Sequence, residues 1–156
     1  FVGEHDYGIE HLSGESVSGP LGDWRGQVGE WFSGNVEYAV TFDCPAALIG
    51  RRARLSLGEV RYSCAASVNG TALGIAIWPP YEFDLTGFLK PGTNTLILTV
   101  TNTMSNALSD PAVVKSWTQR QEREEPGWTA YDKKQRPFEK DSLASGLFGP
   151  VCVEFE

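Results

Sequence analysis

The chain has 156 residues, 41% of them hydrophobic, and a formal net charge of −7. This length is enough for one domain with its own core and too short for two of ordinary size, so we expect a single domain. Because the Lys and Arg residues form no basic cluster and no apolar run approaches the roughly 20 residues of a membrane span, we expect neither nucleic acid nor a membrane as a partner.

The first predicted elements are short strands. Strict alternation of apolar and polar side chains is typical of a half-buried strand, and it begins at residues 36–42. The expected inward side chains are Val36, Tyr38, Val40 and Phe42, then Ala53, Leu55 and Leu57, then Val60, Tyr62, Cys64, Ala66 and Val68. With 17 glycines, 9 prolines and no sustained helical period, the chain is predicted to be mostly β.

A tight hairpin is predicted at Asn69-Gly70, because these residue types favour the positive φ angles of a two-residue turn. Asp84 is then predicted to cap one helical turn over residues 85–89. The apolar side chains of the strand that returns from the hairpin are Leu73, Ile75 and Ile77, and those of the inward face after the cap are Leu96, Leu98 and Val100.

A long irregular insertion is predicted over residues 103–145, because strand periodicity disappears there and ordinary connections have only about 4–6 residues. Asp110-Pro111 favours the start of a short helix within it. The apolar positions are Val113, Val114 and Trp117 on one side of this helix, and Val151, Val153 and Phe155 in a final strand. Because the chain ends on this strand, it is expected to end inside the fold. Such an ending is expected for a C-terminal fragment of a larger protein, or for a domain followed at once by a linker.

Residues 55–106 carry a distinctive order of short motifs, with further motifs on either side. They are Gly22-Asp23-Trp24, Phe32-Ser33-Gly34, Gly58-Glu59-Val60, Val68-Asn69-Gly70, Leu73-Gly74, Trp78 to Tyr81, Phe83-Asp84-Leu85-Thr86, Leu89 to Asn94, Val100 to Thr103 and Ser145 to Val151. In this order the motifs resemble the sugar-binding domain of family 2 glycoside hydrolases and the related β-sandwich modules of large rhamnosidases. The resemblance implies an all-β fold, a galactose-binding-like jelly-roll β-sandwich over residues 1–156, as an accessory domain of a larger enzyme.

The resemblance implies a partner and a location, but not catalysis by this chain. The expected partner is the catalytic domain of a secreted, periplasmic or cell-surface glycoside hydrolase that degrades polysaccharides, since the paired acids of the resembling enzymes lie in their barrel domain. Glycoside hydrolysis needs two carboxylic acids about 5–10 Å apart, and the pair Glu82 and Asp84 includes the predicted cap. His5 and His11, the two histidines, lie in no nucleophile-elbow motif, so we expect the chain to be non-catalytic.

A sugar site typically combines exposed aromatic platforms with amide or charged groups. The candidate carbohydrate-binding residues are Trp78, Tyr81, Asn102, Asn106, Trp117, Trp128 and Tyr131. Two interpretations stay open: the aromatic side chains bind glycan and make the chain an autonomous carbohydrate-binding module, or they cover the sandwich and pack against a neighbouring domain. Similar modules often carry Trp and Arg where this chain has Met104 and Ala107, which favours a structural role for the two asparagines.

A structural calcium ion, held by loop carbonyls and a carboxylate, is implied by the resemblance to jelly-roll modules, but backbone ligands leave no trace in a sequence. A transition-metal site from the two histidines has no spacing signature. Cys64 and Cys152 are expected to be small buried strand residues, and with Cys44 they leave any disulfide pairing open.

Overall fold

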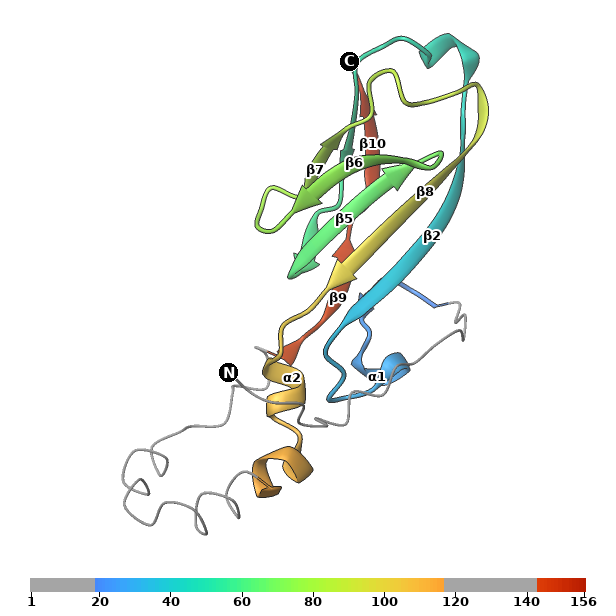
Figure 1. Cartoon of the computed structure of the whole chain (residues 1–156). Coiled ribbons are helices and arrows are strands. Elements are labelled where there is room, and N and C mark those ends of the chain that lie inside the picture. Colours follow the sequence, from blue (N-terminus) through green and yellow to red (C-terminus); the bar gives the residue numbers. More distant parts are fainter. Residues whose placement is uncertain (1–18, 117–142) are drawn as a thin grey trace.

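The computed structural model describes residues 19–116 and 143–156, which form a β-sandwich of two layers (Figure 1). The first layer is a four-stranded antiparallel sheet in the order β2-β8-β5-β6. Its strands are β2 (Asn35–Cys44), β8 (Gly92–Thr101), β5 (Ser63–Val68) and β6 (Thr71–Ala76). The prediction of an all-β sandwich is confirmed.

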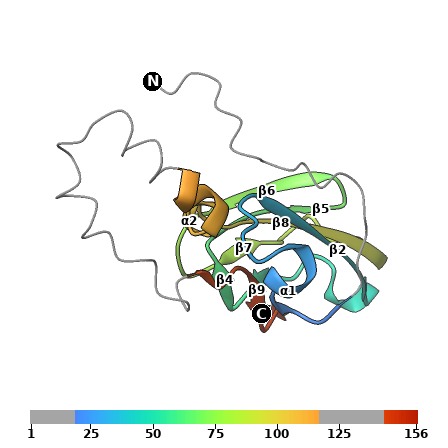
Figure 2. The same ribbon diagram turned by 90° about the horizontal axis from the view of Figure 1, so that it is seen from below.

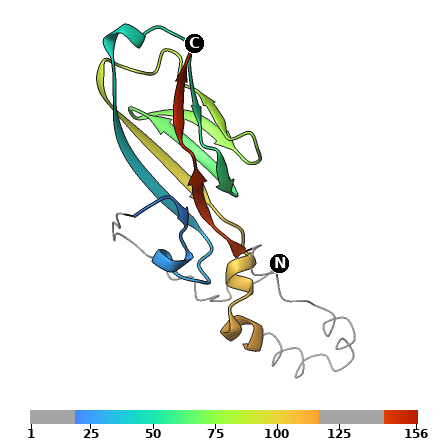
Figure 3. The same cartoon turned by 180° about the vertical axis from the view of Figure 1, so that it is seen from behind.

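The second layer consists of two three-stranded antiparallel sheets, in the orders β10-β3-β7 and β1-β9-β4. Their strands are β10 (Cys152–Phe155), β3 (Ala53–Ser56), β7 (Glu82–Asp84), β1 (Gly22–Asp23), β9 (Gly146–Gly149) and β4 (Glu59–Arg61). Figure 3 shows the last two strands, in red, running one after the other along this layer. They therefore connect the two small sheets.

Short helices lie outside the two layers. They are α1 (Arg25–Val28), α2 (Ser105–Leu108) and a 3-10 turn, Ala46–Leu48. Figure 2, seen from below, shows α1 and α2 at one end of the sandwich. Residues 111–116 are also helical, and Oδ1 of Asp110 accepts a hydrogen bond from Ala112 N at 2.7 Å, in agreement with the predicted helix start. Within the described residues no helix is long and apolar enough to cross a membrane.

The core lies between the two layers and follows the predicted inward faces. Its fully buried side chains include Leu55, Leu57, Cys64, Val68, Leu85, Leu98 and Val100. Burying each Leu or Val contributes roughly 1.5–3 kcal/mol. Trp24 is also buried and meets Phe32 edge to face, with ring centroids 6.2 Å apart. The strongest alternating segments of the sequence thus supply the packing that holds the two layers together.

The predicted turns are present. Asn69 and Gly70 have φ angles of 50° and 80°, which join β5 to β6 by a two-residue hairpin. The buried side chain of Asn94 accepts a hydrogen bond from Asn69 Nδ2 at 2.8 Å and donates one to Lys90 O at 2.8 Å. Oδ1 of Asp84 accepts a hydrogen bond from the main-chain N–H two residues later at 2.8 Å, so it caps a turn as expected. Residues 86–88 form a simple turn, however, and not the helical turn predicted over residues 85–89.

Two sequence predictions are wrong because the alternating pattern does not reveal which sheet a strand joins. Residues 60–68 were expected to form one strand, yet β4 pairs with β9 and β5 pairs with β8, so the chain changes sheet at Tyr62. Cys152 was expected to be buried, but it is exposed. It pairs with Ser56, whereas the next residue, Val153, pairs with the buried Leu55 and packs against the core.

Three further positions that were expected to face inward, Val40, Ile75 and Ile77, are exposed. Val40 keeps 48% of its surface, because β2 is an edge strand with a neighbour on one side only. In β6 the register shifts opposite Ala66 and Ser67, which inserts Leu73 as an extra residue. A shift of one residue moves every later side chain to the other face of a sheet. Ile75 therefore pairs with the outward Ala65 and is 72% exposed.

Candidate functional site

Three exposed, large apolar side chains lie close together in the sequence at the end of β6. Ile75, Ile77 and Trp78 are 72%, 57% and 70% exposed, and we call these three residues the β6 edge. The prolines that follow, Pro79 and Pro80, are exposed as well. Trp78 is therefore the one candidate aromatic among the described residues whose ring is open to a ligand or a partner.

Tyr81 comes from the same loop but points into the fold. Its side chain is 6% exposed, and its hydroxyl donates a hydrogen bond to Tyr62 O at 2.6 Å. Burial raises the pKa of the Tyr81 hydroxyl, so it stays a neutral donor. The bond joins the loop after β6 to the point where the chain changes sheet, between β4 and β5.

Asn102, Asn106 and Ser145 form a buried polar group that we call the polar clamp. Asn102 Oδ1 accepts from Gly34 N at 2.8 Å, and its Nδ2 donates to Phe32 O at 2.8 Å and to Ser145 Oγ at 2.9 Å. The clamp therefore joins the loop before β2 to the end of β8 and to the start of β9.

Asn106 extends the clamp to the segment just before β9. It donates from Nδ2 to Leu143 O at 2.8 Å, and Ser145 Oγ donates to the same carbonyl at 2.9 Å. Buried polar groups need such partners, because an unsatisfied one costs about 1–3 kcal/mol. Both asparagine side chains are thus occupied by protein partners, as the structural role favoured from the sequence requires.

Asp23 adds a charged group beside the clamp. Its Oδ1 accepts hydrogen bonds from Arg25 Nε at 3.0 Å and from Ser145 N at 3.4 Å. Burial alone would raise the pKa of Asp23, but the hydrogen bonds from Arg25 and Ser145 outweigh it and hold the pKa below its usual range. Asp23 therefore stays ionised and suits an ion pair rather than a general acid.

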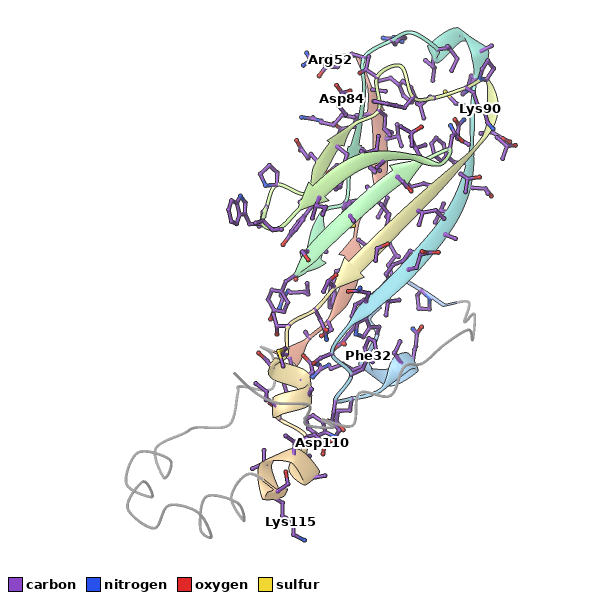
Figure 4. The ribbon with its side chains drawn as sticks, in the orientation of Figure 1. Phe32, Arg52, Asp84, Lys90, Asp110 and Lys115 are labelled. Atoms are coloured by element: carbon purple, nitrogen blue, oxygen red, sulfur yellow. The ribbon has the colours of Figure 1, made fainter. Side chains whose placement is uncertain are left out.

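A second polar surface covers the outer side of β10-β3-β7. We call it the charged face, and it consists of Arg52, Arg54, Glu82, Asp84, Glu154 and Glu156, which line an open groove of about 470 Å³. Arg54 lies 2.7 Å from Glu154 and 3.4 Å from Glu82. Figure 4 shows Arg52 and Asp84 close together, at the end of the sandwich away from α2.

The charged face does not have the chemistry of a glycosidase acid pair. Glu82 and Asp84 share one face of β7, as expected, but Glu82 pairs with Arg54. Hydrogen bonds from Thr86 lower the pKa of Asp84, whereas a general acid needs a raised pKa. The aromatic residue of the groove, Phe83, is buried, so the groove presents no platform for a sugar ring.

Several candidates of the sequence lie outside the described residues. They are Trp117, Trp128, Tyr131 and the two histidines, His5 and His11. Across residues 19–116 and 143–156, no three His, Cys, Asp or Glu side chains are grouped as metal ligands. A calcium ion bound mainly by loop carbonyls stays a prediction. All three cysteines are unpaired, and burial raises the pKa of Cys64 to about 11.

Comparison with known proteins finds two relatives that are named for glycosidase activity. No family model matches the chain. It is 30% identical to a β-glucuronidase candidate of Formosa agariphila, over 80% of this chain and 12% of that protein. A solved rhamnosidase from Novosphingobium sp. PP1Y is 31% identical over 79% of this chain and 11% of its own, with a TM-score of 0.53. The chain is a glycoside hydrolase-related β-sandwich domain.

A third comparison concerns the fold alone. A solved β-glucuronidase from Ruminococcus gnavus, in complex with a C6-substituted uronic isofagomine, has a TM-score of 0.52 and 16% identity over 62% of this domain and 18% of that chain. The resemblance noted from the sequence, to sandwich modules of rhamnosidases and family 2 glycoside hydrolases, is confirmed. The domain spans about an eighth or less of its first two relatives.

Sequence reasoning missed parts of the site that depend on strand pairing. The ion pairs of Arg54 need three strands that are far apart in the sequence, and the order of those strands cannot be read from alternation. Ser145 gave no signal, because its role depends on the return of the chain to Asn102. The outward turn of Ile75 could have been suspected from Leu73-Gly74, since a glycine inside a strand often marks a bulge.

Proposed function

We propose that this domain is a non-catalytic, sugar-binding-like accessory domain of a larger, secreted or cell-surface glycoside hydrolase that degrades polysaccharides. The observation that carries this proposal is the pattern of coverage: about four fifths of the domain matches only 11–12% of each of two large relatives named for glycosidase activity. The remainder of such an enzyme would contain the catalytic domain, which this domain would support.

Two structural observations support the non-catalytic role. Glu82 and Glu154 are ion-paired with Arg54, and hydrogen bonds from Thr86 lower the pKa of Asp84, the opposite of what a general acid needs. The β6 edge leaves three large apolar side chains on the surface, which suits a domain that packs against another.

The test compares the full parent polypeptide with a version that lacks this domain, on a panel of aryl rhamnosides and glucuronides. We expect hydrolysis by the parent, none by the 156-residue chain, and a parent without the domain that unfolds at a lower temperature. Turnover by the 156-residue chain that is lost in Glu82→Gln would contradict the proposal.

A second function, an autonomous carbohydrate-binding module, is favoured by one observation: Trp78 is 70% exposed. Affinity electrophoresis on a panel of plant and microbial polysaccharides, with and without calcium, tests it directly. In this case Trp78→Ala should weaken binding by roughly 1–3 kcal/mol, the scale of a lost aromatic anchor. Alanine variants of Trp117, Trp128 and Tyr131 test the other candidates, and no retardation on any glycan would exclude this function for the panel.

A further inference from the structure

We propose that the outer face of the β2-β8-β5-β6 sheet, together with the β6 edge, is the surface by which the domain docks onto its neighbour in the parent polypeptide. We call this surface the open sheet face. The neighbour would present apolar side chains opposite β6 and basic side chains opposite β2. This inference rests on the proposed accessory function and adds to it the surface, the orientation and the chemistry of the partner.

The two outer faces of the sandwich differ sharply in charge. The four strands of the open sheet face contain two charged residues, Glu37 and Asp43, and no Lys or Arg. On the other layer, the charged face carries two arginines and four acids, with ion pairs that join three strands. The cores of protein interfaces are depleted in charged residues, so the ion-paired face is the one suited to water.

The strand register shows which residues form the open sheet face. One row across the sheet pairs Glu37 with Thr99, Thr99 with Ala65 and Ala65 with Ile75. The next row consists of Ala39, Ile97, Ser67 and Ala72. Five of the eight side chains in these rows are Ala, Ser or Thr, and the first row runs from an acidic residue on β2 to an apolar one on β6. Another protein surface can approach such short side chains closely.

The edge of this sheet carries no charged residue. Exposed edge strands are normally protected by Lys, Pro, inward charges or a β-bulge, and β6, with the sequence TALGIA, has only the bulge. This bulge turns Ile75 outward, and Gly74 makes this possible with a φ of +126°. An edge that presents an exposed Ile and no charge is suited to contact with another protein surface.

The charge of this face indicates which kind of partner can bind it. Glu37 and Asp43 both lie on β2, at the border of the sheet opposite β6, and Asp43 accepts a hydrogen bond from Thr93 Oγ1 at 2.7 Å. These carboxylates complement a basic rim on a partner. A second copy of this chain is a poor fit, because each copy carries a net charge of −7. A glycan is also a poor fit, because Ile, Ala and Gly surround the edge where a sugar needs polar groups.

Hydroxyl-radical footprinting of the intact parent polypeptide tests the docking surface. The oxidation rate of Trp78 in the native parent is divided by its rate in the unfolded parent, with Met104, which is 64% exposed, as an internal reference. We expect Trp78 to be protected at least about fivefold, as in a desolvated interface core, while Met104 is not. A Trp78 as reactive as its 70% exposure implies would overturn the inference.

Variants of the parent separate docking from folding. Ile75→Lys with Ile77→Lys changes two exposed side chains and should abolish the protection of Trp78. The control, Arg52→Glu with Glu156→Lys, swaps an exposed ion pair on the charged face and should leave the protection unchanged. Protection that appears only with added polysaccharide, or only at high protein concentration, would overturn the inference in favour of a glycan or a second copy.

The same samples distinguish this inference from the proposed function. A parent that hydrolyses glycosides but leaves Trp78 fully reactive refutes only the docking surface. A parent that hydrolyses no glycoside refutes the proposed function, whatever the footprint of Trp78 shows.

Discussion

Removing the side chain of Asn102 should destabilise the domain far more than its single amide suggests. The side chain makes three short hydrogen bonds, to Gly34 N, Phe32 O and Ser145 Oγ, at 2.8, 2.8 and 2.9 Å. A hydrogen bond contributes about 1 kcal/mol net, and a buried group left without a partner costs about 1–3 kcal/mol. Asn102→Ala should therefore lower the free energy of unfolding by about 3 kcal/mol, which corresponds to a fall in Tm of roughly 6–12 °C for a domain of this size.

Urea unfolding followed by tryptophan fluorescence measures this loss, because Trp24 packs against Phe32 beside the clamp. The matched control is Asn35→Ala, whose exposed side chain accepts one hydrogen bond from Thr101 at 2.7 Å and should cost less than about 0.5 kcal/mol. If Asn102→Ala is no more destabilising than Asn35→Ala, the clamp does not hold the loops together and our account of it is wrong.

Three further predictions concern sterics, pH and thiol chemistry. Gly58→Ala would place a Cβ 2.3 Å from the carbonyl oxygen of Gly149, at a φ of +63°. It should therefore cost several times the roughly 1 kcal/mol expected of Gly70→Ala, where φ is +80° but a Cβ would meet open space. Equal urea midpoints for the two variants would refute the clash. Because the folded-state pKa of Asp23 lies below its unfolded value near 4, Asp23 stabilises the domain above that pH and the contribution is lost as pH falls through the folded pKa. Asp23→Asn should flatten the fall of the urea midpoint below about pH 4, and an unchanged slope would contradict this. Ellman's reagent at neutral pH should titrate the exposed Cys152 at once and the two buried thiols only after unfolding.

Much of the fold follows from local patterns, because its inward faces obey a period of two. Residues 96–100 and 53–57 are buried where alternation predicts, and the hairpin at Asn69-Gly70 depends on residue types that adopt positive φ. These features need no knowledge of distant contacts. The change of sheet at Tyr62 and the outward Cys152 could not be predicted, because burial at those points depends on which strand becomes the neighbour.

The candidate site was less predictable, since exposure at a surface is decided by register. Trp78 and Tyr81 belong to one short loop, and composition treats them alike, yet one is 70% and the other 6% exposed. The difference arises because the Tyr81 hydroxyl reaches Tyr62 O, a contact between segments 19 residues apart. The bulge in β6 has a similar effect: one extra residue converts Ile75 from an expected core residue into part of a surface.

The polar clamp explains how a sandwich can carry the insertion predicted at 103–145. Asn106 and Leu143 lie 37 positions apart in the sequence, and Asn102 and Ser145 lie 43 apart, yet each pair is joined by a short hydrogen bond. Closing a loop of about 40 residues rather than 10 costs only about 1.2 kcal/mol more, since the entropy grows with the logarithm of length. The bonds of the clamp are enough to offset that cost. The clamp therefore fixes the two ends of the interval in which three of the candidate aromatics, Trp117, Trp128 and Tyr131, fall.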